Sequence, residues 1–486
     1  MRKFLEKDKR SMRKTKIVCT LGPSSSSEKE LEAMLRAGMN VARLNFSHGD
    51  HASHKERVET FRRVRDRLHL PAAVMLDTKG PEIRICDFDN PDHRIELAEG
   101  DHFTLTTREV KGTQEEVSIT YADLPSQLAP GNRILIDDGR IQLTVESVTD
   151  TDIRTVVAFG GTLSRQKSIN VPYVKLNMPF LSDKDKDDLR FGVELDVDFV
   201  SASFVRCKED VIEMRKFLDY YGGHAIKIIA KIENSEGVDN FDEILANCDG
   251  IMVARGDMGV EIAFERLPGI QKRFIRKCYS AGKMVITATQ MLESMIHAVT
   301  PTRAEITDVA NAVFDGTSAV MLSGETAMGD HPALVVRTMA KIAEQAEADA
   351  LDMDVYRNMA HARDEGDTTN AICDAACTTA EDIGAKALIA VTKSGTTARR
   401  MSKFRPRQTI VAATPELKSY HQLALSWGVV PVLARDQFDT DALFRHAIDC
   451  ARQIDAVKRG DTVVISAGVP LNLEGMTNLL KVQVVK

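Results

Sequence analysis

The chain has 486 residues, of which 43% are hydrophobic and 28% are charged, a balance typical of a globular protein with substantial cores. Its net charge of −7 argues against a general nucleic-acid binder, although a local basic pocket remains compatible with it. At roughly 150 residues for each domain, the length suggests about three domains.

The first ten residues are charged and no apolar segment follows them, so we expect no signal peptide. No run reaches the roughly 18 apolar residues that a membrane span needs. The eight cysteines are scattered without a CxxC pair, which is typical of proteins in a reducing compartment. These features predict a cytoplasmic protein that does not enter a membrane.

Short apolar strands alternate with helices in the first part of the chain and again after about Ser182. The expected strands are Lys16–Thr20, Asn40–Asn45, Ala72–Asp77, Phe199–Ser203, Lys227–Lys231, Gly250–Ala254, Val285–Ala288 and Ser318–Leu322. Eight such βα units are the number in a closed parallel (β/α)8 TIM barrel. We therefore predict a barrel domain of residues 12–80 and 176–348, preceded by a tail of residues 1–11.

Residues 81–175 have a different sequence pattern, with short segments rich in Thr and Val in which apolar and polar residues alternate. Expected strands are Ser118–Thr120, Arg133–Ile136, Gln142–Val148 and Arg154–Ala158. The Asp137-Asp138-Gly139 segment between two of them is typical of a hairpin turn. This pattern predicts an all-β domain inserted after the third barrel strand, where it can act as a lid over the barrel mouth.

Residues 349–486 follow a long predicted helix, Ala333–Ala348, and alternate helices with strands once more. The expected strands are Ala387–Val391, Thr409–Ala413, Thr462–Ser466 and Leu480–Val485. We predict an open α/β sheet domain here, after a polar linker at residues 363–367.

The apolar run of residues 226–232 is followed directly by a carboxylate and contains a lysine near its end. Lys231 and Glu233 share one face of this strand because they are two positions apart. A charged pair at the carboxyl end of a hydrophobic strand is costly unless a metal ion or an anion binds there. A structural ion pair explains the two residues equally well, so both interpretations stand at this point.

Other predicted strands also end in polar residues, and together these suggest a site. Glu233 and Asp257, from adjacent strands, can supply two carboxylates to Mg²⁺, with substrate and water completing its shell. Arg43, Arg84 and Lys231 then surround a space that suits a phosphate, and Gly256 allows backbone N–H groups to approach an anion. A metal ion beside clustered cations is what phosphoryl transfer requires. The GxxxxGK[ST], HRD, DFG and GxGxxG motifs are absent, so such an enzyme would need another architecture.

Seven segments support one family. In chain order they are ARLNFSHG, LDTKGPEIR, KIIAKIEN, IMVARGDMGVEI, TATQMLESM, PTRAE and AVMLSGETA, and together they resemble pyruvate kinase. The resemblance covers the chain from about Lys16 to the C-terminus. It implies a TIM barrel, a β-barrel lid and an α/β domain with an effector site, assembled as a homotetramer. The implied reaction moves the phosphoryl group of phosphoenolpyruvate to ADP, gives ATP and pyruvate, and is the last step of glycolysis.

The resemblance also implies catalytic roles by position. Lys231 would neutralise the transferring phosphoryl group and stabilise the enolate, while Glu233 and Asp257 would hold Mg²⁺ or Mn²⁺. Because Lys231 and Glu233 would then have different ligands, we expect that they do not form a structural ion pair. Arg43 would bind phosphate, and Arg84 would complete the cage when the lid closes.

Further roles concern the carboxylate, the phosphate and the nucleotide. The amides of Gly256 and Asp257, with Thr289, would hold the substrate carboxylate, and Ser203 would contact phosphate. The implied nucleotide contacts are Asn45, His48, Arg84 and Lys184. Protonation of the enolate would run through water near Thr289, with Ser323 a second candidate.

A monovalent cation is also expected. Asn45, Ser47, Asp77 and Thr78 match the K⁺ site of the family. At the position of Glu82 the family carries glutamate in K⁺-dependent members and lysine in independent ones. The resemblance therefore implies activation by K⁺.

Three weaker patterns each have a plain structural alternative. His48, His51 and His54 could suggest zinc, but their spacing drifts around a helix, and His48 fits better near the nucleotide. The segment containing Thr392, Ser394, Gly395, Thr396 and Thr397 follows a strand and opens a helix, which suits a phosphorylated effector or an ordinary N-cap. Four basic residues after it form either a ligand site or a solvated basic face: Arg399, Arg400, Lys403 and Arg405.

Two other functions remain as alternatives. A barrel lyase or aldolase acting on pyruvate enolate also needs paired carboxylates, Mg²⁺ and an arginine, but it does not explain the lid or the phosphate cage. A catalytically silent metabolite sensor would keep the fold, although every chemical residue is present.

Overall fold

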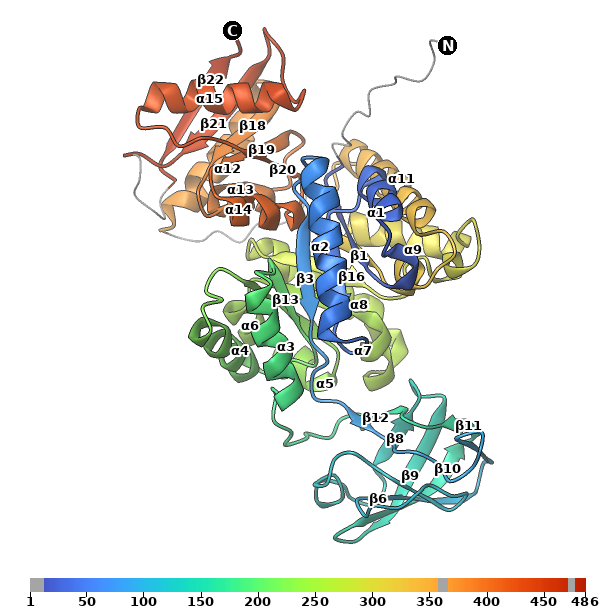
Figure 1. Cartoon of the computed structure of the whole chain (residues 1–486). Helices are drawn as coiled ribbons and strands as arrows, with labels where there is room; N and C mark the ends of the chain where they lie inside the picture. Colours follow the sequence, from blue (N-terminus) through green and yellow to red (C-terminus); the bar gives the residue numbers. More distant parts are fainter. Residues whose placement is uncertain (1–12, 357–365, 471–476) are drawn as a thin grey trace, which may run out of the picture.

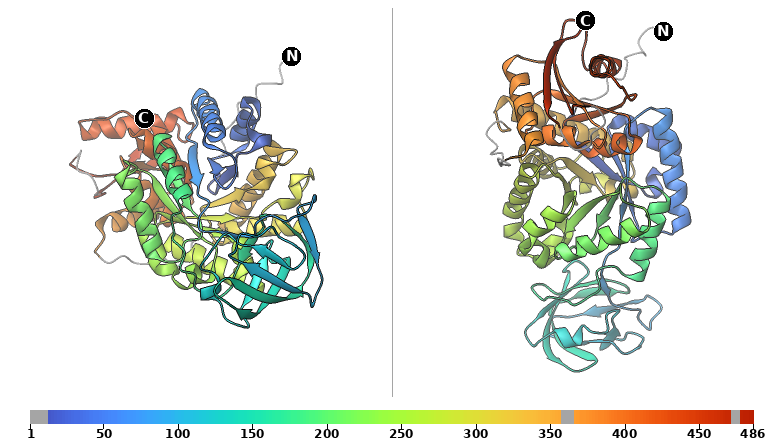
Figure 2. Two further views of the ribbon diagram at one scale, coloured as in Figure 1. Left: turned by 60° about the horizontal axis from the view of Figure 1, so that its bottom comes forward. Right: turned by 90° about the vertical axis from the view of Figure 1, so that its left-hand side faces the viewer.

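Three bodies follow one another along the molecule: the inserted β-rich region, the barrel and the C-terminal region (Figures 1 and 2). The computed structural model describes residues 13–356, 366–470 and 477–486, so the predicted tail of residues 1–11 and most of the predicted linker lie outside it. Within those residues, no helix combines the length and the apolar character needed to cross a bilayer.

Eight parallel strands close into a barrel in the order β1-β17-β16-β15-β14-β13-β3-β2, which confirms the predicted (β/α)8 fold. The strands are β1 (Lys16–Thr20), β2 (Val41–Asn45), β3 (Ala73–Asp77), β13 (Phe199–Ala202), β14 (Lys227–Ile232), β15 (Gly250–Ala254), β16 (Met284–Ala288) and β17 (Ala319–Leu322). The surrounding helices are α1 (Glu28–Ala37), α2 (His51–Arg67), α3 (Asp183–Glu194), α4 (Lys208–Tyr220), α5 (Ser235–Asp239), α6 (Phe241–Asn247), α7 (Arg255–Glu261), α8 (Leu267–Ser280), α9 (Arg303–Phe314), α10 (Gly324–Ala327) and α11 (Pro332–Asp352).

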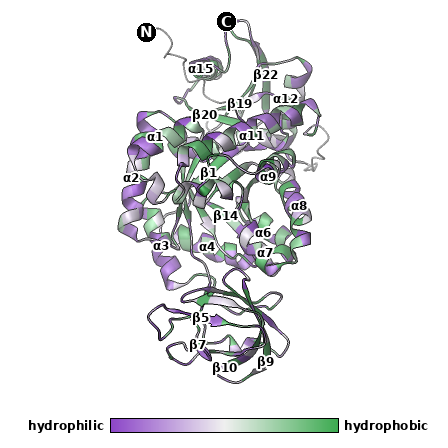
Figure 3. Ribbon diagram, turned by 90° about the vertical axis from the view of Figure 1, so that its right-hand side faces the viewer, coloured by the Kyte–Doolittle hydropathy of each residue, from purple (hydrophilic) through white to green (hydrophobic). Residues whose placement is uncertain are grey.

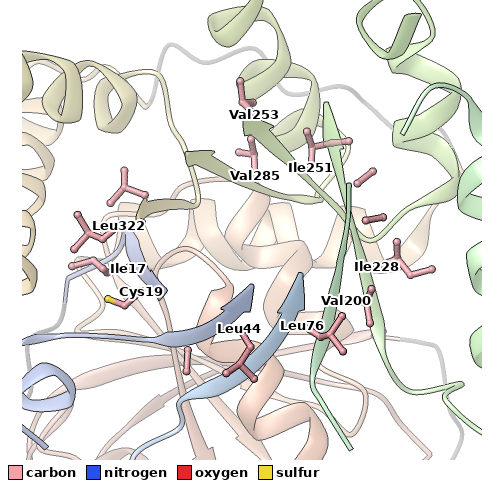
Figure 4. Close-up of a cluster of buried hydrophobic side chains, with 14 of the residues drawn as sticks. Ile17, Cys19, Leu44, Leu76, Val200, Ile228, Ile251, Val253, Val285 and Leu322 are labelled. Atoms are coloured by element: carbon pink, nitrogen blue, oxygen red, sulfur yellow. The ribbon is translucent and has the colours of Figure 1, made fainter. Parts of the chain in front are cut away.

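Both faces of the barrel strands are buried, which is why they appear in the sequence as continuous apolar runs. One row of side chains points outward and packs against the helices, whose outer faces are hydrophilic (Figure 3). Members of this outward row include Ile17, Leu44, Leu76, Val200, Ile228, Ile251, Val285 and Leu322 (Figure 4).

The other row fills the barrel interior and leads directly to polar residues at its mouth. Met75 on β3 and Ile229 on β14 belong to the interior cluster. Because side chains alternate along a strand, the next interior positions on these strands are Asp77 and Lys231. The alternation of side chains along each strand therefore places charged residues at one end of an otherwise apolar barrel interior.

The chain leaves the barrel after β3 and forms a β-rich region before it returns at α3. Its strands are β4 (Ile83–Arg84), β5 (Arg94–Leu97), β6 (His102–Thr106), β7 (Glu116–Ser118), β8 (Arg133–Ile136), β9 (Ile141–Val148), β10 (Asp152–Phe159), β11 (Gly161–Ser164) and β12 (Ser168–Asn170). The predicted hairpin is confirmed: β8 and β9 pair antiparallel, and Asp138 and Gly139 have φ of 56° and 80°, as a primed turn requires.

The strands of this region form a seven-stranded sheet, with β4 and β7 at its two ends, and a two-stranded sheet around one apolar core. Register shifts within the β9–β10 pairing, at Arg154/Thr155 and Val157/Phe159, interrupt the ladder. Such bulges bend and twist strands, which curves the larger sheet around the core. Just beyond β4 and β7 its two ends meet, because Ile85 and Ile119 form an antiparallel bridge and the Cys86 N–H donates to the Ser118 carbonyl at 2.8 Å. These bonds close the ring, as the β-barrel implied by the resemblance requires.

The C-terminal region contains a five-stranded sheet in the order β20-β19-β18-β21-β22, which confirms the predicted open α/β sheet. Its strands are β18 (Ala387–Val391), β19 (Thr409–Thr414), β20 (Val429–Leu433), β21 (Thr462–Ala467) and β22 (Leu479–Val484), and its helices are α12 (Thr368–Asp382), α13 (Thr396–Lys403), α14 (Leu417–Gln422) and α15 (Thr440–Gln453). The sequence prediction omitted β20, which contains Pro431; the strand lies at the sheet edge, where a missing N–H is tolerated.

The C-terminal region packs against the amino ends of the barrel strands. Leu425 joins the interior cluster of the barrel, and Lys16 Nζ donates to the Val429 carbonyl at 2.8 Å. Gln422 Nε2 donates to the Asp198 carbonyl at 3.1 Å. The carboxyl ends of the strands are therefore left to face the inserted region (Figure 1).

Candidate active site

A buried network of two cations and two carboxylates lies at the carboxyl ends of β2, β3 and β14. Arg43 Nε donates to Asp77 Oδ2 at 2.7 Å, and Lys231 Nζ lies 3.1 Å from Asp77 Oδ1. Lys231 Nζ also lies 3.0 Å from Glu233 Oε1 and donates to Ser203 Oγ at 2.7 Å. From the sequence, Asp77 is predicted only as a K⁺ ligand. In the structure its carboxylate bonds to both Arg43 and Lys231, the two cations expected to bind phosphate.

The pairing of Lys231 with Glu233 corrects one sequence-based interpretation. From their different expected ligands, we predicted that the two side chains would not form an ion pair. Both side chains are at most 10% exposed and share one strand face, so each is the nearest opposite charge available to the other.

The charges set the protonation of this network. Burial alone would lower the pKa of Lys231, but Asp77 and Glu233 outweigh it, so its pKa lies above the ordinary value. Burial likewise works against the charged form of Asp77, but Arg43 and Lys231 hold its pKa below the usual range. Lys231 is therefore a fixed positive charge at neutral pH.

Asp257 gives the network an excess of negative charge. It lies in the first turn of α7, near enough to act electrostatically on both Lys231 and Glu233. Burial, reinforced by Asp257, raises the pKa of Glu233 to about 7 against the pull of Lys231. Three carboxylates face two cations, Arg43 and Lys231, so the site is electrostatically suited to an added cation.

The carboxylates of Glu233 and Asp257 fit a divalent cation by type and charge. Glu233 Oε2 accepts the Phe204 N–H at 2.6 Å, which orients the carboxylate. Within the described ranges, no group of three or more His, Cys, Asp and Glu is arranged for a metal ion. Proteins typically bind Mg²⁺ through one or two carboxylates and leave its other coordination positions to substrate and water.

Gly256 and Thr289 also come together at this end. The Gly256 N–H donates to Thr289 Oγ1 at 2.8 Å. A Cβ on Gly256 would lie 3.5 Å from that oxygen, an ordinary contact, so the protein itself does not require glycine there. An anion received by this amide would benefit from the missing side chain.

Arg255 is a residue of the site that the sequence analysis overlooked. Its guanidinium donates to the carbonyls of Ala288 at 3.1 Å and Thr289 at 2.5 Å, and it pairs with Asp308 at 2.7 Å. These bonds secure a turn in which Thr289 has a φ of 67°, a costly conformation for a β-branched residue. The only sequence signal was its place beside Gly256.

The residues expected to bind K⁺ line the neighbouring ends of β2 and β3. Asn45 and Asp77 are paired in register, and Asn45 Oδ1 accepts the Ser47 N–H at 3.1 Å. Thr78 Oγ1 accepts the Ser203 N–H at 3.1 Å. These four residues therefore lie at or just after the neighbouring ends of β2 and β3, although Asp77 already serves both Arg43 and Lys231.

Arg84 lies apart from the buried network, on lid strand β4. It pairs with Glu82 at 2.6 Å and donates to the Gln166 carbonyl. Its bonding partners are Glu82, Thr120 and Gln166, so none of these bonds joins it to the buried network. The lid touches the barrel through Asn170 Nδ2, which donates to Glu261 Oε1 at 3.0 Å.

The other residues implied to bind nucleotide surround the end of β2. Lys184 Nζ donates to the Phe46 carbonyl at 3.0 Å and pairs with Asp188 at 2.6 Å. His48 is exposed at this rim, His51 pairs with Asp188 at 2.7 Å, and His54 is buried against Phe46. His54 Nε2 bonds to the His48 carbonyl at 2.8 Å, so this ring nitrogen is not open to a metal ion.

The segment predicted to bind an effector is well ordered by its own hydroxyls. Thr392 Oγ1 accepts the Gly395 N–H at 3.0 Å, and Ser394 and Thr396 hydroxyls lie 2.9 Å apart. Thr397 Oγ1 contacts Thr477 Oγ1 at 2.7 Å. The segment opens helix α13, as predicted, and these bonds serve the turn itself.

The basic residues after this segment are not a solvated face. Lys403 is 1% exposed and Arg405 is 4% exposed, while Arg399 and Arg400 are partly buried. The amphipathic helix α13 ends at Lys403, where its basic side chains turn toward the barrel and away from water.

Comparisons with known proteins agree across the whole chain. The family model described as "Pyruvate kinase, barrel domain" matches residues 12–336, and "Pyruvate kinase, alpha/beta domain" matches residues 370–483. A pyruvate kinase of Clostridium acetobutylicum is 49% identical, with 98% of this chain and 100% of the relative covered. One from Staphylococcus saprophyticus is also 49% identical, covering 98% of this chain and 81% of the relative. One from Clostridium perfringens is 46% identical, with 97% and 100% covered.

Proposed function

The chain belongs to the pyruvate kinase family of phosphotransferases, and we propose that it transfers the phosphoryl group of phosphoenolpyruvate to ADP, giving ATP and pyruvate in the last step of glycolysis. The observation that carries this proposal is the buried network of Arg43, Asp77, Lys231 and Glu233 beside Asp257. Its fixed cations suit a phosphoryl group, and its net negative charge suits a divalent cation.

We propose that the protein's cations stabilise the charge that develops during transfer. The bond between phosphorus and the enol oxygen breaks, a bond to the β-phosphate oxygen of ADP forms, and the electron pair stays on the enolate oxygen. Lys231 neutralises the moving phosphoryl group and then the enolate, while Arg43 and Ser203 hold phosphate oxygens. Arg84 joins them when the lid closes.

Mg²⁺ or Mn²⁺, held by Glu233 and Asp257, would supply Lewis-acid charge between phosphate and substrate. The amides of Gly256 and Asp257 and the Thr289 hydroxyl hold the substrate carboxylate. The enolate is then protonated at carbon through water near Thr289, giving pyruvate. Asn45, His48, Arg84 and Lys184 contact the nucleotide, which places ADP along the end of β2.

We further propose that K⁺ binds at Asn45, Ser47, Asp77 and Thr78 and activates the enzyme. Glu82, whose carboxylate pairs with Arg84 at 2.6 Å, would add negative charge that a monovalent cation offsets near anionic substrates.

The C-terminal region is proposed to regulate the enzyme by binding a phosphorylated metabolite at Thr392, Ser394, Gly395, Thr396 and Thr397. A homotetramer with interfaces through the barrel and C-terminal domains is proposed from the family. The domain boundaries predicted above remain predictions. All eight cysteines are free thiols, which fits the proposed action in a reducing cytoplasm.

The proposal is tested by coupling pyruvate formation to lactate dehydrogenase, with phosphoenolpyruvate and ADP as substrates. Phosphoenolpyruvate-dependent ATP formation at the same rate supports phosphoryl transfer. A lyase would release no ATP, and a silent sensor would bind substrate without turnover. Thermal shift with sugar phosphates and AMP would then identify the effector.

A further inference from the structure

A small cavity lies at the junction between the barrel and the C-terminal region, far from the carboxyl ends of the barrel strands. It offers about 10 Å³ of space for the centre of a water-sized group. Met284 and Ser318 line it from the barrel, and Arg405, Ser426 and Trp427 line it from the C-terminal region. Its occupant therefore contacts both bodies.

Arg405 is a buried charge without a carboxylate partner. Its side chain donates to the Ser402 carbonyl at 2.6 Å and the Gly316 carbonyl at 2.9 Å, and its guanidinium stacks 4.7 Å from the Trp427 ring centre. None of the ion pairs among the described residues includes Arg405. A buried ion normally acquires a counter-charge, because its loss of hydration costs several kcal/mol.

Three buried polar atoms beside the cavity have no hydrogen-bond partner among the described residues. They are Arg405 Nε, Trp427 Nε1 and Ser426 Oγ, from side chains that are 4%, 1% and 2% exposed. Two are obligatory N–H donors, and the hydroxyl can donate a third bond. Buried polar atoms of this kind usually mark a bound water or ion.

The remaining lining favours an anion over water. Among the described lining residues, four are Lys or Arg, namely Lys283, Arg399, Lys403 and Arg405, and none is Asp or Glu. Burial lowers the pKa of Arg405 to about 10, so it stays charged at neutral pH. Water satisfies donors but leaves this positive charge uncompensated.

We propose that the cavity is a structural site for one small monovalent anion of chloride size, bound by Arg405 Nε, Trp427 Nε1 and Ser426 Oγ. The ion completes the hydrogen bonds of these groups and supplies the missing counter-charge. All three ligands belong to the C-terminal region, and Arg405 also donates to the Gly316 carbonyl of the barrel at 2.9 Å, so the ion holds in place the side chain that reaches across the junction. Binding therefore stabilises the junction of the two bodies.

The single tryptophan of the chain makes this site directly observable. With the full-length protein at constant K⁺ and ionic strength, potassium gluconate is replaced stepwise by potassium chloride or bromide while Trp427 fluorescence is recorded. The expected result is a saturable change with one binding constant for chloride and for bromide, with deeper quenching by the heavier ion. Gluconate, too large for the cavity, should produce no change.

Variants assign the response to the cavity. Ser426→Ala should weaken chloride binding about tenfold or more, as loss of a hydrogen bond to an ion predicts, and Ser426→Val should abolish the saturable phase by filling the space. Arg407→Met, at an exposed arginine paired with Asp354, is the matched control and should behave as wild type. These changes avoid the risk that Arg405→Met prevents folding.

Diffraction at the bromine edge from bromide-soaked crystals provides an independent measurement. An anomalous peak between Arg405 Nε and Trp427 Nε1 is expected. Purely linear quenching by bromide in solution, or an anomalous map with no peak in the cavity, would overturn the proposal and assign the place to water.

Discussion

Lys231 and Glu233 form a buried ion pair in which Nζ lies 3.0 Å from Oε1, at the carboxyl end of one barrel strand. The same ammonium is 3.1 Å from Asp77, so it serves two carboxylates, while Glu233 has one cationic partner within the described part of the chain. The negative charge of Glu233 is consequently less fully balanced than the positive charge of Lys231, and the nearby charge of Asp257 further disfavours the ionised form of Glu233. A metal ion at Glu233 would release Lys231 toward a phosphoryl group.

Replacing Lys231 by methionine should abolish most turnover while leaving metal binding largely intact. Loss of one preorganised charge from a transition-state site costs roughly 10²–10³ in kcat, and this lysine is proposed to act on two successive charges. Steady-state kinetics and calorimetric titration with Mn²⁺ measure the two effects. Lys227→Met is the matched control, because Lys227 lies on the same strand but pairs with Asp249 away from the mouth. Equal losses of kcat in Lys231→Met and Lys227→Met would contradict the proposed role of Lys231.

Activity should depend on K⁺ through Glu82. With Mg²⁺ present and tetramethylammonium in place of K⁺, we expect kcat/KM for phosphoenolpyruvate to fall about tenfold or more, which equals about 1.4 kcal/mol of transition-state stabilisation. Glu82→Lys should restore most activity without K⁺, since the ammonium supplies the absent positive charge. Glu82→Gln is the control for loss of the carboxylate alone. Full wild-type activity in tetramethylammonium salts would refute a K⁺ site.

Arg255 is expected to position Thr289. Arg255→Lys keeps the charge but cannot hold the carbonyls of Ala288 and Thr289 together with Asp308, so the turn should relax. We expect kcat/KM for phosphoenolpyruvate to fall about 10²-fold while KM for ADP stays within about twofold. Asp308→Asn should give a smaller loss in the same direction.

Chemical rescue separates positioning from general destabilisation at Arg255. Guanidinium ion at low millimolar concentration should raise the activity of Arg255→Ala, and ammonium ion should not. Arg63→Ala, which removes an exposed arginine paired with Glu28, supplies the control. An Arg255→Ala enzyme with normal thermal stability and normal kinetics would show that Thr289 needs no such support.

Asp198 should make the junction between barrel and C-terminal region sensitive to pH. Burial raises its pKa from 3.8 to about 6, although Lys418 and the Val74 N–H oppose the shift. The protonated form is thus favoured by folding, and its stabilisation is complete below pH 3.8 and lost as the pH rises through about 6. Relative to Asp198→Asn, the wild type should lose on the order of 3 kcal/mol of unfolding free energy across this window.

Urea unfolding of both proteins between pH 4 and pH 7 measures this difference. The comparison is needed because His421, whose pKa is lowered to about 4 by burial and by the charge of Arg65, contributes with the opposite sign. Asp150→Asn, at an exposed loop carboxylate, controls for the change in net charge. A wild-type minus Asp198→Asn difference that stays constant with pH would contradict the raised pKa.

Elements with a strong local pattern were predictable, and those that depend on distant neighbours were not. The barrel strands could be identified because burial on both faces makes each an apolar run, and the Asp138-Gly139 turn because its backbone favours those residues. Strand β20 was missed because Pro431 weakens the local strand pattern. A proline is tolerated in this strand only because β20 lies at the edge of the sheet, and that position is set by the tertiary structure.

The sequence by itself determined which chemical groups end the barrel strands and, through strand parity, that Lys231 and Glu233 share a face. Only the tertiary structure decided that Asp77 joins Arg43 to Lys231 and that Arg255 supports Thr289. It also decided that Arg405 is buried with no carboxylate partner among the residues that the structure describes. Side-chain direction along a strand is a local property with a period of two residues. Charge compensation and burial depend on residues that are far apart in the chain and meet only in the folded molecule.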